Sequence, residues 1–328
     1  MTSFYTNAQS FGNYILYRGI LDGKRVKQRI EYSPSLYIPS KKITKFTSLD
    51  GEYLDQKIFG NIREAKDYIK QFDSVHNTKV YGNTRFEYAY IADQYQGMVD
   101  WDKDKIVTAV IDIEVGSENG FPDPYLANEP ITAICIKYIN GDTFVFGCGE
   151  YNTQGSEIYV KCKDEWTLCK KFMELWTKKC PDTITGWNTK FFDIPYIINR
   201  FRKILGEDDT KKLSPWNYIG ERKTNVHGRE LIAYDMMGVS SLDYMEMYKW
   251  FAPSGKSQES YRLDNIAQVE LGKGKISYDE YDNLFTLLTS SDGVTVDKNK
   301  PIENMKPFER WCLLKDNIKE ELQSRTQI

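Results

Sequence analysis

Two carboxylates interrupt an otherwise apolar run at residues 106–115, IVTAVIDIEV. β-Branched residues dominate the run, which predicts a central, fully buried β-strand. Asp112 and Glu114 are two positions apart, so on a strand both side chains project from the same face. Unpaired burial of such charges is costly, so either two cations lie opposite or the carboxylates hold divalent metal. Because the strand contains no Arg or Lys, we favour metal over an inward ion-pair cluster.

A second carboxylate motif lies in TGWNTKFFDIPY, residues 185–196. A short strand is expected to end at Gly186-Trp187, and after a loop Asp193 opens a helix that tolerates Pro195 in its first turn. Taken alone, Asp193 is equally well explained as a helix N-cap. Beside the strand that carries Asp112 and Glu114, it would add a third carboxylate from another element. Three such ligands are what a two-metal phosphodiester site needs.

Composition limits the classes of function. The 328 residues favour about two domains, and no apolar stretch is long enough to span a membrane. The N-terminus lacks a signal-peptide core, so we expect a soluble protein of the cytoplasm, of a host cell if the chain is viral. The net charge of −3 argues against a protein that coats nucleic acid non-specifically. Six Cys without a CxxC pair predict buried thiols, and only two His make carboxylates and metal the expected catalytic groups.

The chain is predicted to have two domains. Residues 1–105 indicate a small α+β domain, with a hairpin that turns at Asp22-Gly23, a helix over 61–72 and a further apolar run, RFEYAYIAD. Residues 106–328 give the order β, β, β, α, β, α, which predicts an α/β domain with a mixed sheet covered by helices. The helix expected over 164–180 would bury one face, formed by Trp166, Cys169, Phe172 or Met173, and Trp176.

The segment from Arg18 to Lys45 is basic. It holds eight Lys or Arg against Asp22 and Glu31, and Tyr32 and Tyr37 are interleaved. We favour a solvated hairpin face as the explanation. The alternative is a surface for single-stranded nucleic acid, where basic charge and stacking aromatic rings act together.

The two carboxylate motifs carry a specific resemblance. The sequence DIE at 112–114 resembles the first exonuclease motif of the family B DNA polymerases, and GWNTKFFDIPY at 186–196 resembles the second. The similarity is greatest to the T-even phage type and extends over residues 1 to about 285, including GFPDP at 120–124.

The resemblance implies a 3′–5′ proofreading exonuclease of ribonuclease H-like fold that uses two Mg²⁺ or Mn²⁺ ions. By position, Asp112 would bridge both metals, Glu114 would hold the metal that carries the water, and Asp193 would hold the other. A hairpin over 221–232, with His227 and Gly228 at its turn, would help to part the primer from the template; a plain sheet-edge hairpin is the alternative. The residues expected to contact the DNA strand are Phe121, as a wedge or simply as a loop-packing residue, Trp187, Asn188 and Phe192.

The third motif of the family, Tyr-x-x-x-Asp, has no clean match. Tyr278 and Asp282 have the spacing but lie in a segment that precedes the motif. We favour Asp316 as the fourth ligand because it falls on a predicted helix, although Cys312 stands where the tyrosine is expected. Alternatively, residues 286–328 are a substituted tail.

No polymerase palm motif occurs in the sequence, so we expect no DNA synthesis by this chain alone. It is expected to be half of a split polymerase, working with a separate polymerase subunit, or a fragment. The predicted helix in 304–322 places Phe308, Trp311 and Leu314 on one stripe, which would contact that partner or pack back and supply Asp316. A catalytically weakened module that binds nucleic acid, or docks the polymerase half, is the alternative function.

Overall fold

The protein is described from a computed structural model. It describes residues 2–72, 79–116, 120–151, 153, 155–226, 228–251, 258 and 260–272. Asp282 and Asp316 lie outside the described residues, as do His76, His227, Tyr278, Phe308, Trp311, Cys312 and Leu314. The expectations for these positions therefore stay predictions.

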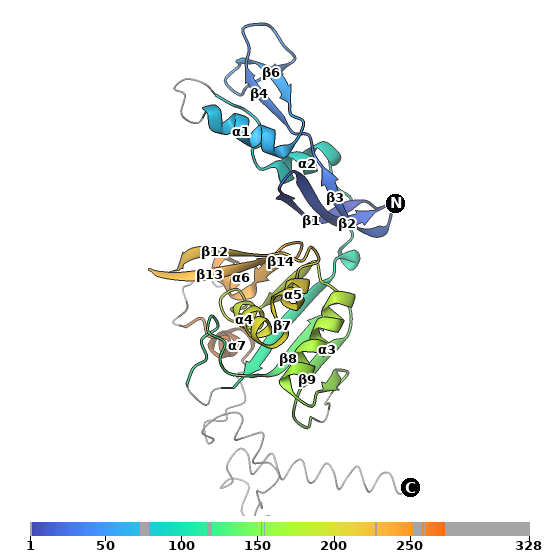
Figure 1. Ribbon diagram of the computed structural model, residues 1–328, viewed down its shortest axis with the longest axis vertical. Helices are drawn as coiled ribbons and strands as arrows, with labels where there is room; N and C mark the ends of the chain where they lie inside the picture. Colours follow the sequence, from blue (N-terminus) through green and yellow to red (C-terminus); the bar gives the residue numbers. More distant parts are fainter. Residues whose placement is uncertain are drawn as a thin grey trace, which may run out of the picture. The chain divides into compact units, whose positions relative to one another are not determined.

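The first hundred residues form two three-stranded antiparallel sheets (Figure 1). The sheet of order β1-β2-β3 consists of Phe4–Phe11, Tyr14–Leu21 and Lys24–Glu31. The sheet of order β4-β6-β5 consists of Ser35–Pro39, Tyr53–Ile58 and Phe46–Thr47. Between β2 and β3, Asp22 and Gly23 both adopt positive φ, at 49° and 78°, as a two-residue hairpin turn requires. The predicted hairpin is confirmed.

Two helices share a core with these strands. They are α1 (Ile62–Phe72) and α2 (Phe86–Gln94), so the apolar run RFEYAYIAD is helical. Ile15, Leu36, Ile62 and Phe86 are all buried in one hydrophobic cluster that is separate from the core of the later residues. Two separate cores support the predicted boundary near residue 105, which stays a prediction.

The later residues contain a six-stranded mixed sheet of order β10-β9-β8-β7-β11-β14. Its strands are β7 (Thr108–Val115), β8 (Ile131–Tyr138), β9 (Thr143–Gly147), β10 (Ile158–Lys161), β11 (Thr183–Gly186) and β14 (Ser240–Asp243). β7 pairs with β8 and β8 with β9 antiparallel, whereas β11 pairs with both β7 and β14 in parallel. The strand that carries the two carboxylates is central, as predicted.

Two helices cover one face of this sheet (Figure 1). α3 (Glu165–Lys178) packs on β8 and β9, and α4 (Asp193–Leu205) packs on β7. The stripe that α3 buries is Leu168, Cys169, Phe172, Met173 and Trp176. The prediction for Trp166 is wrong: the residue is 53% exposed, because it lies two positions after the N-cap Asp164 and away from that stripe.

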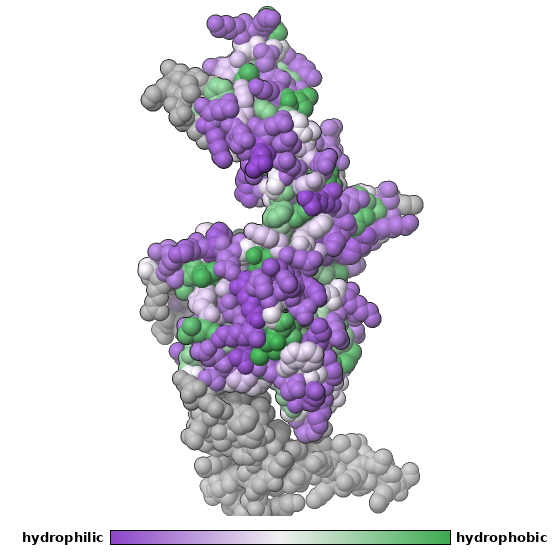
Figure 2. Space-filling view, viewed as in Figure 1, coloured by the Kyte–Doolittle hydropathy of each residue, from purple (hydrophilic) through white to green (hydrophobic). Residues whose placement is uncertain are grey.

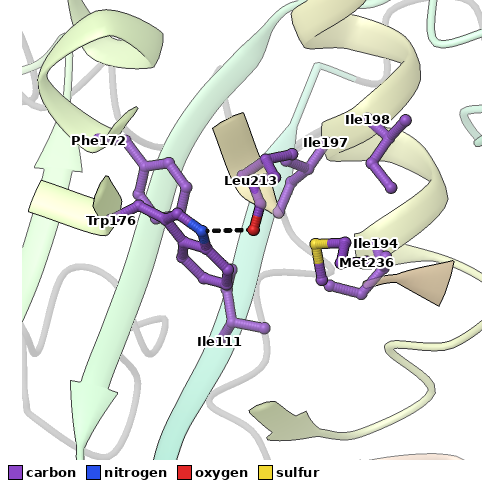
Figure 3. Close-up of a pocket in the computed structure, with 8 residues that line it drawn as sticks. All are labelled: Ile111, Phe172, Trp176, Ile194, Ile197, Ile198, Leu213 and Met236. Atoms are coloured by element: carbon purple, nitrogen blue, oxygen red, sulfur yellow. Dashed lines mark hydrogen bonds between the residues drawn. The ribbon is translucent and has the colours of Figure 1, made fainter. Parts of the chain in front are cut away.

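The space between these helices and β7 is filled by side chains (Figure 3). The Trp176 indole N–H donates to the carbonyl oxygen of Leu213 at 2.8 Å, beside Ile111 and Met236. The remaining cavity of about 10 Å³ is about one water in size and is lined by apolar groups. This interior space is therefore too small to hold a ligand larger than water.

The other elements are a hairpin and several short helices. A two-stranded antiparallel hairpin is built from β12 (Ile219–Val226) and β13 (Arg229–Met236). The remaining helices are η1 (Lys103–Lys105), α5 (Glu207–Thr210), η2 (Lys211–Leu213), α6 (Tyr244–Phe251) and α7 (Leu263–Leu271). The predicted hairpin is confirmed, and it forms its own small sheet rather than an edge of the large one.

The described cysteines do not form disulfides. Cys162 and Cys169 are buried, but Cys148 is exposed just after β9, so the prediction of buried thiols is wrong for that residue. No helix in the described part of the chain is long and apolar enough to cross a membrane. The visible surface is mainly hydrophilic, with scattered apolar side chains (Figure 2).

Candidate active site

The carboxylates of β7 are not buried as the sequence predicted. Ala109, Ile111 and Ile113 are buried, whereas Asp112 and Glu114 are exposed. The strand thus alternates like a sheet with one covered face, because α4 packs on the face that carries Ile111. Asp112 and Glu114 do share one face, as predicted, but the acidic side chain that is buried belongs to another residue.

That residue is Asp193, whose side chain accepts a hydrogen bond from the backbone of β7. β11 leaves β7 after Gly186, where a Cβ would lie 2.6 Å from the carbonyl oxygen of Ile111. Only glycine allows this close approach. Beyond it, the Ile113 N–H donates to Asp193 Oδ1 at 3.2 Å. The carboxyl group of the second motif therefore lies against the backbone between the two carboxylates of the first.

Asp193 is held in an environment that disfavours its charge. The side chain is buried, with 3% of the residue exposed, at the first position of α4. Burial, together with the nearby carboxylates of Asp112 and Asp243, raises the pKa of Asp193 from 3.8 to about 7. The N-cap alternative is wrong, because the cap residue is Phe192 and no side chain caps the helix.

The donor set suits a hard divalent cation. Carboxylate oxygens are the preferred ligands of Mg²⁺, and a cation beside Asp193 would relieve the unfavourable charge that raises its pKa. Within the described ranges, however, no group of three or more His, Cys, Asp or Glu is close enough to hold a metal. Asp112, Glu114 and Asp193 thus provide potential ligands, and the fourth predicted ligand lies outside the described residues.

Asp243 is a buried carboxylate at the site that sequence reasoning missed. It ends β14, is 3% exposed, and accepts hydrogen bonds from three backbone N–H groups. Asn188 N and Met245 N donate to Oδ1 at 3.1 and 2.9 Å, and Lys190 N donates to Oδ2 at 3.0 Å. Asp243 therefore fixes the loop between β11 and α4. The sequence signal was an acidic residue at a strand end, in SSLDYM.

Replacing Asp243 with alanine should lower the free energy of unfolding by about 3 kcal/mol, because three partly buried N–H groups lose their acceptor. Urea denaturation measures this change. Glu246→Gln is the matched control: Glu246 bonds Lys190 of the same loop, but from a partly exposed position, so it should cost less than about 1 kcal/mol. Equal losses in the two variants would contradict the assignment.

The residues predicted to contact DNA fall into two groups. Phe121 is 87% exposed and its ring centroid lies 5.5 Å from that of Phe192, so these two rings are close together. Trp187 instead packs among aromatic residues of α6, and its indole N–H donates to the Tyr261 carbonyl oxygen at 3.0 Å. Asn188 has a positive φ of 62° and shapes the loop. A role in DNA contact stays a prediction for all four.

Comparisons with known proteins identify the family of this chain. Residues 54–266 match the exonuclease domain of DNA polymerase family B. The chain therefore belongs to this family and carries its exonuclease domain, which confirms the resemblance inferred from the motifs.

Relatives come from phages, viruses and eukaryotes. The chain is 34% identical to the DNA-directed DNA polymerase of Escherichia phage RB69 and 31% identical to that of Enterobacteria phage T4, over 85% of this chain in each case. It is 30% identical to the DNA polymerase delta catalytic subunit of Caenorhabditis elegans, over 42% of this chain and 15% of that protein. The chain spans about a third, 34%, of the length of the two phage relatives.

Proposed function

We propose that this chain is a 3′–5′ exonuclease of ribonuclease H-like fold that removes 3′-terminal nucleotides from single-stranded or mismatched DNA. The observation that carries the proposal is the hydrogen bond from Ile113 N–H to Asp193 Oδ1. It brings the second motif to the backbone between Asp112 and Glu114, in a chain that belongs to an exonuclease family.

Each carboxylate has a distinct task in this proposal. Asp112 and Glu114, exposed on one face, would bind cations and orient the scissile phosphate between them. Asp193, buried and bonded to the Ile113 N–H, would help to hold a second cation. Two divalent cations, Mg²⁺ or Mn²⁺, would supply an activated water and stabilise charge on the leaving oxygen. Asp316 remains the proposed fourth ligand.

The exposed ring of Phe121 supports a preference for frayed ends. Beside Phe192, it offers an aromatic surface on which an unpaired base can stack, and a paired base cannot reach it without melting. Melting stacked pairs costs a few kcal/mol. The confirmed hairpin of β12 and β13 is proposed to help keep the two strands apart.

Single-stranded and mismatched 3′ ends should therefore be cut at least about tenfold faster than blunt duplex ends. Digestion of 5′-labelled strands with Mg²⁺ or Mn²⁺ measures the ratio. Phe121→Ala should reduce it, whereas Leu126→Ala, another exposed apolar residue of the same segment, should not. Equal rates on all three ends with the wild-type chain would contradict this specificity.

A second function is favoured by one feature of the sequence: Cys312 stands at the position of the tyrosine expected in the third motif. This departure supports a weakened module that binds nucleic acid or docks a separate polymerase subunit. Digestion of a labelled strand separates the two. Cleavage that requires metal and is lost in Asp112→Ala supports the exonuclease, and binding without cleavage supports the module.

We also propose a separate polymerase subunit as a partner of this chain. The phage relatives are DNA-directed DNA polymerases, and the chain spans about a third of their length. Size exclusion after co-expression with a palm-bearing protein tests the complex. A stable complex that Trp311→Glu abolishes, with the subunit still folded, would support contact through residues 304–322.

A further inference from the structure

Two cysteines occupy adjacent positions on neighbouring strands at one end of the six-stranded sheet. β10 is the outermost strand and pairs with β9 in parallel, with Gly147 and Lys161 as the last register partners. Cys148 and Cys162 are the next residues on the two strands. The pairing continues to this point, because the Cys162 N–H donates to the Gly147 carbonyl oxygen at 2.9 Å. Neighbouring strands lie about 4.8 Å apart, so the two cysteines are adjacent across the ladder.

The register also places both thiols on the face of the sheet that α3 covers. Side chains alternate along a strand, so Cys148 shares a face with Phe146, and Cys162 shares a face with Val160. Phe146 packs on Phe172 of α3 with ring centroids 5.7 Å apart, and Val160 packs against the same core. Cys162 is buried in that core, whereas Cys148 is exposed. The pair thus consists of one thiol at the surface and one behind it.

The electrostatics of the two thiols support this proximity. Burial raises the pKa of the Cys148 thiol, and the neighbouring Cys162 raises it further. Burial also raises the pKa of Cys162, whose thiol donates to the Val160 carbonyl oxygen at 3.3 Å. Both groups are therefore protonated near neutral pH. Because the thiolate is the reactive form, we expect them to react slowly at neutral pH and faster in mild alkali.

The other described cysteines are placed differently. Cys135 has Asp112 and Val145 as its cross-strand partners, and Cys180 follows α3 outside any strand. Cys169 is on α3, where burial is the main cause that raises its pKa and Cys148 contributes. Among the described residues, Cys148 and Cys162 are thus the two cysteines that stand side by side on paired strands, and Cys169 is the competing partner for Cys148.

We propose that Cys148 and Cys162 form a modification site, at which a low-molecular-weight disulfide installs a reversible disulfide bond between β9 and β10. The strand spacing of about 4.8 Å lies within the range of Cα separations that a disulfide bridges. Both residues follow the last register partners, so a small adjustment of their backbone leaves the paired residues in place.

The exposed thiol reacts first and the buried thiol completes the bond. The Cys148 thiolate attacks one sulfur of the reagent, which forms a mixed disulfide and releases one thiolate. Cys162 then gives up its proton and attacks Cys148 Sγ, which releases the second half of the reagent as a thiolate. Two protein thiols are oxidised to one disulfide, and one reagent disulfide is reduced to two thiols. The burial of Cys162 keeps bulky reagents from it and leaves it free to act on its neighbour.

The bond would fasten the edge of the sheet. β10 contains four residues, and its partner β9 contains five, so the pair is short. A link between Cys148 and Cys162 closes the chain over residues 148–162 and restrains both strand ends. Amide hydrogen exchange over 158–161 should therefore slow by at least about tenfold in the linked form. In the sheet, β8 and β9 lie between β10 and the strand that carries Asp112.

The test treats the full chain with oxidised glutathione at pH 8.5, blocks free thiols and digests it with trypsin without reduction. Mass spectrometry should find residues 138–161 joined to residues 162–163. Formation should be about tenfold slower at pH 7.5, because the thiolate fraction falls tenfold for each pH unit below the pKa. Cys148→Ser and Cys162→Ser should both abolish the link. Cys135→Ser is the matched control and should form it at the wild-type rate.

Several results would overturn the proposal. These are glutathione that stays attached to Cys148 in the wild type, a link from Cys148 to Cys169, or a disulfide between two chains on a non-reducing gel. Unchanged amide exchange over 158–161 in the linked form would show that the bond does not hold the edge. Added dithiothreitol should restore both the free thiols and the original exchange rates. None of these measurements depends on nuclease activity, so this proposal and the proposed function fail separately.

Discussion

Replacing Asp112 and Glu114 together with alanine should abolish metal-dependent digestion of a labelled single strand, by at least about a thousandfold. The expectation follows from the proposed site, where both side chains are exposed on one face of β7 and would hold the cations. A thousandfold loss is about 4 kcal/mol of transition-state stabilisation. The measurement is the initial rate of digestion with Mg²⁺ and with Mn²⁺.

The same double variant should stay folded, because exposed carboxylates contribute little to stability. Its free energy of unfolding should lie within about 1 kcal/mol of the wild-type value. Asp142→Ala/Glu150→Ala is the matched control: it removes two exposed carboxylates from elsewhere on the chain, and digestion should continue at the wild-type rate. An active Asp112→Ala/Glu114→Ala enzyme would refute the proposed mechanism, and a variant that cannot fold would indicate a structural role instead.

In EDTA, wild-type stability should fall relative to that of Asp193→Asn as the pH rises from about 4 to about 7. Burial raises the pKa of Asp193 to about 7, so over this range the folded protein binds a proton that the unfolded chain has released. Stability falls with pH wherever the folded state binds more protons. The full effect is up to about 4 kcal/mol, at about 1.4 kcal/mol for each pKa unit.

Urea unfolding of both proteins at pH 5 and pH 8 measures this difference, since other titrating groups contribute equally to each. Asp193→Asn should be the more stable of the two at pH 8. Adding Mg²⁺ at pH 8 should then stabilise the wild type but not Asp193→Asn, by about 2.7 kcal/mol at a hundredfold excess over the dissociation constant. If the stability of the two proteins changes with pH in the same way, the pKa of Asp193 is not raised in the folded protein.

The sequence was sufficient for the elements that depend on local pattern. Alternation around Asp22-Gly23 located the hairpin, and the β-branched run located the central strand, because periodicity and turn chemistry are properties of neighbouring residues. The same holds for α4, where Pro195 fits the first turn as expected. The shared face of Asp112 and Glu114 also follows from strand geometry alone.

Other features depend on how the elements pack against one another, which a local pattern does not contain. α4 covers the face of β7 that carries Ile111, and Asp112 and Glu114 lie on the opposite face, so these carboxylates escape the burial predicted for them. The buried charge is on Asp193, and it accepts the N–H that a longer β11 would have paired. Asp243 was missed because its three partners are backbone groups, which leave no signature in the residue types around it.

This last feature bears on how the chain tolerates change. The Asp243 carboxylate accepts hydrogen bonds from the backbone N–H groups of Asn188 and Lys190. The loop should therefore keep its conformation with any side chain at position 190 except that of proline, which has no N–H. Fewer residue types are expected to be tolerated at position 188, because its left-handed backbone conformation favours asparagine, aspartate or glycine. Substitutions at position 190 can therefore change the charge on the surface of the loop without changing the backbone conformation that positions Asp193.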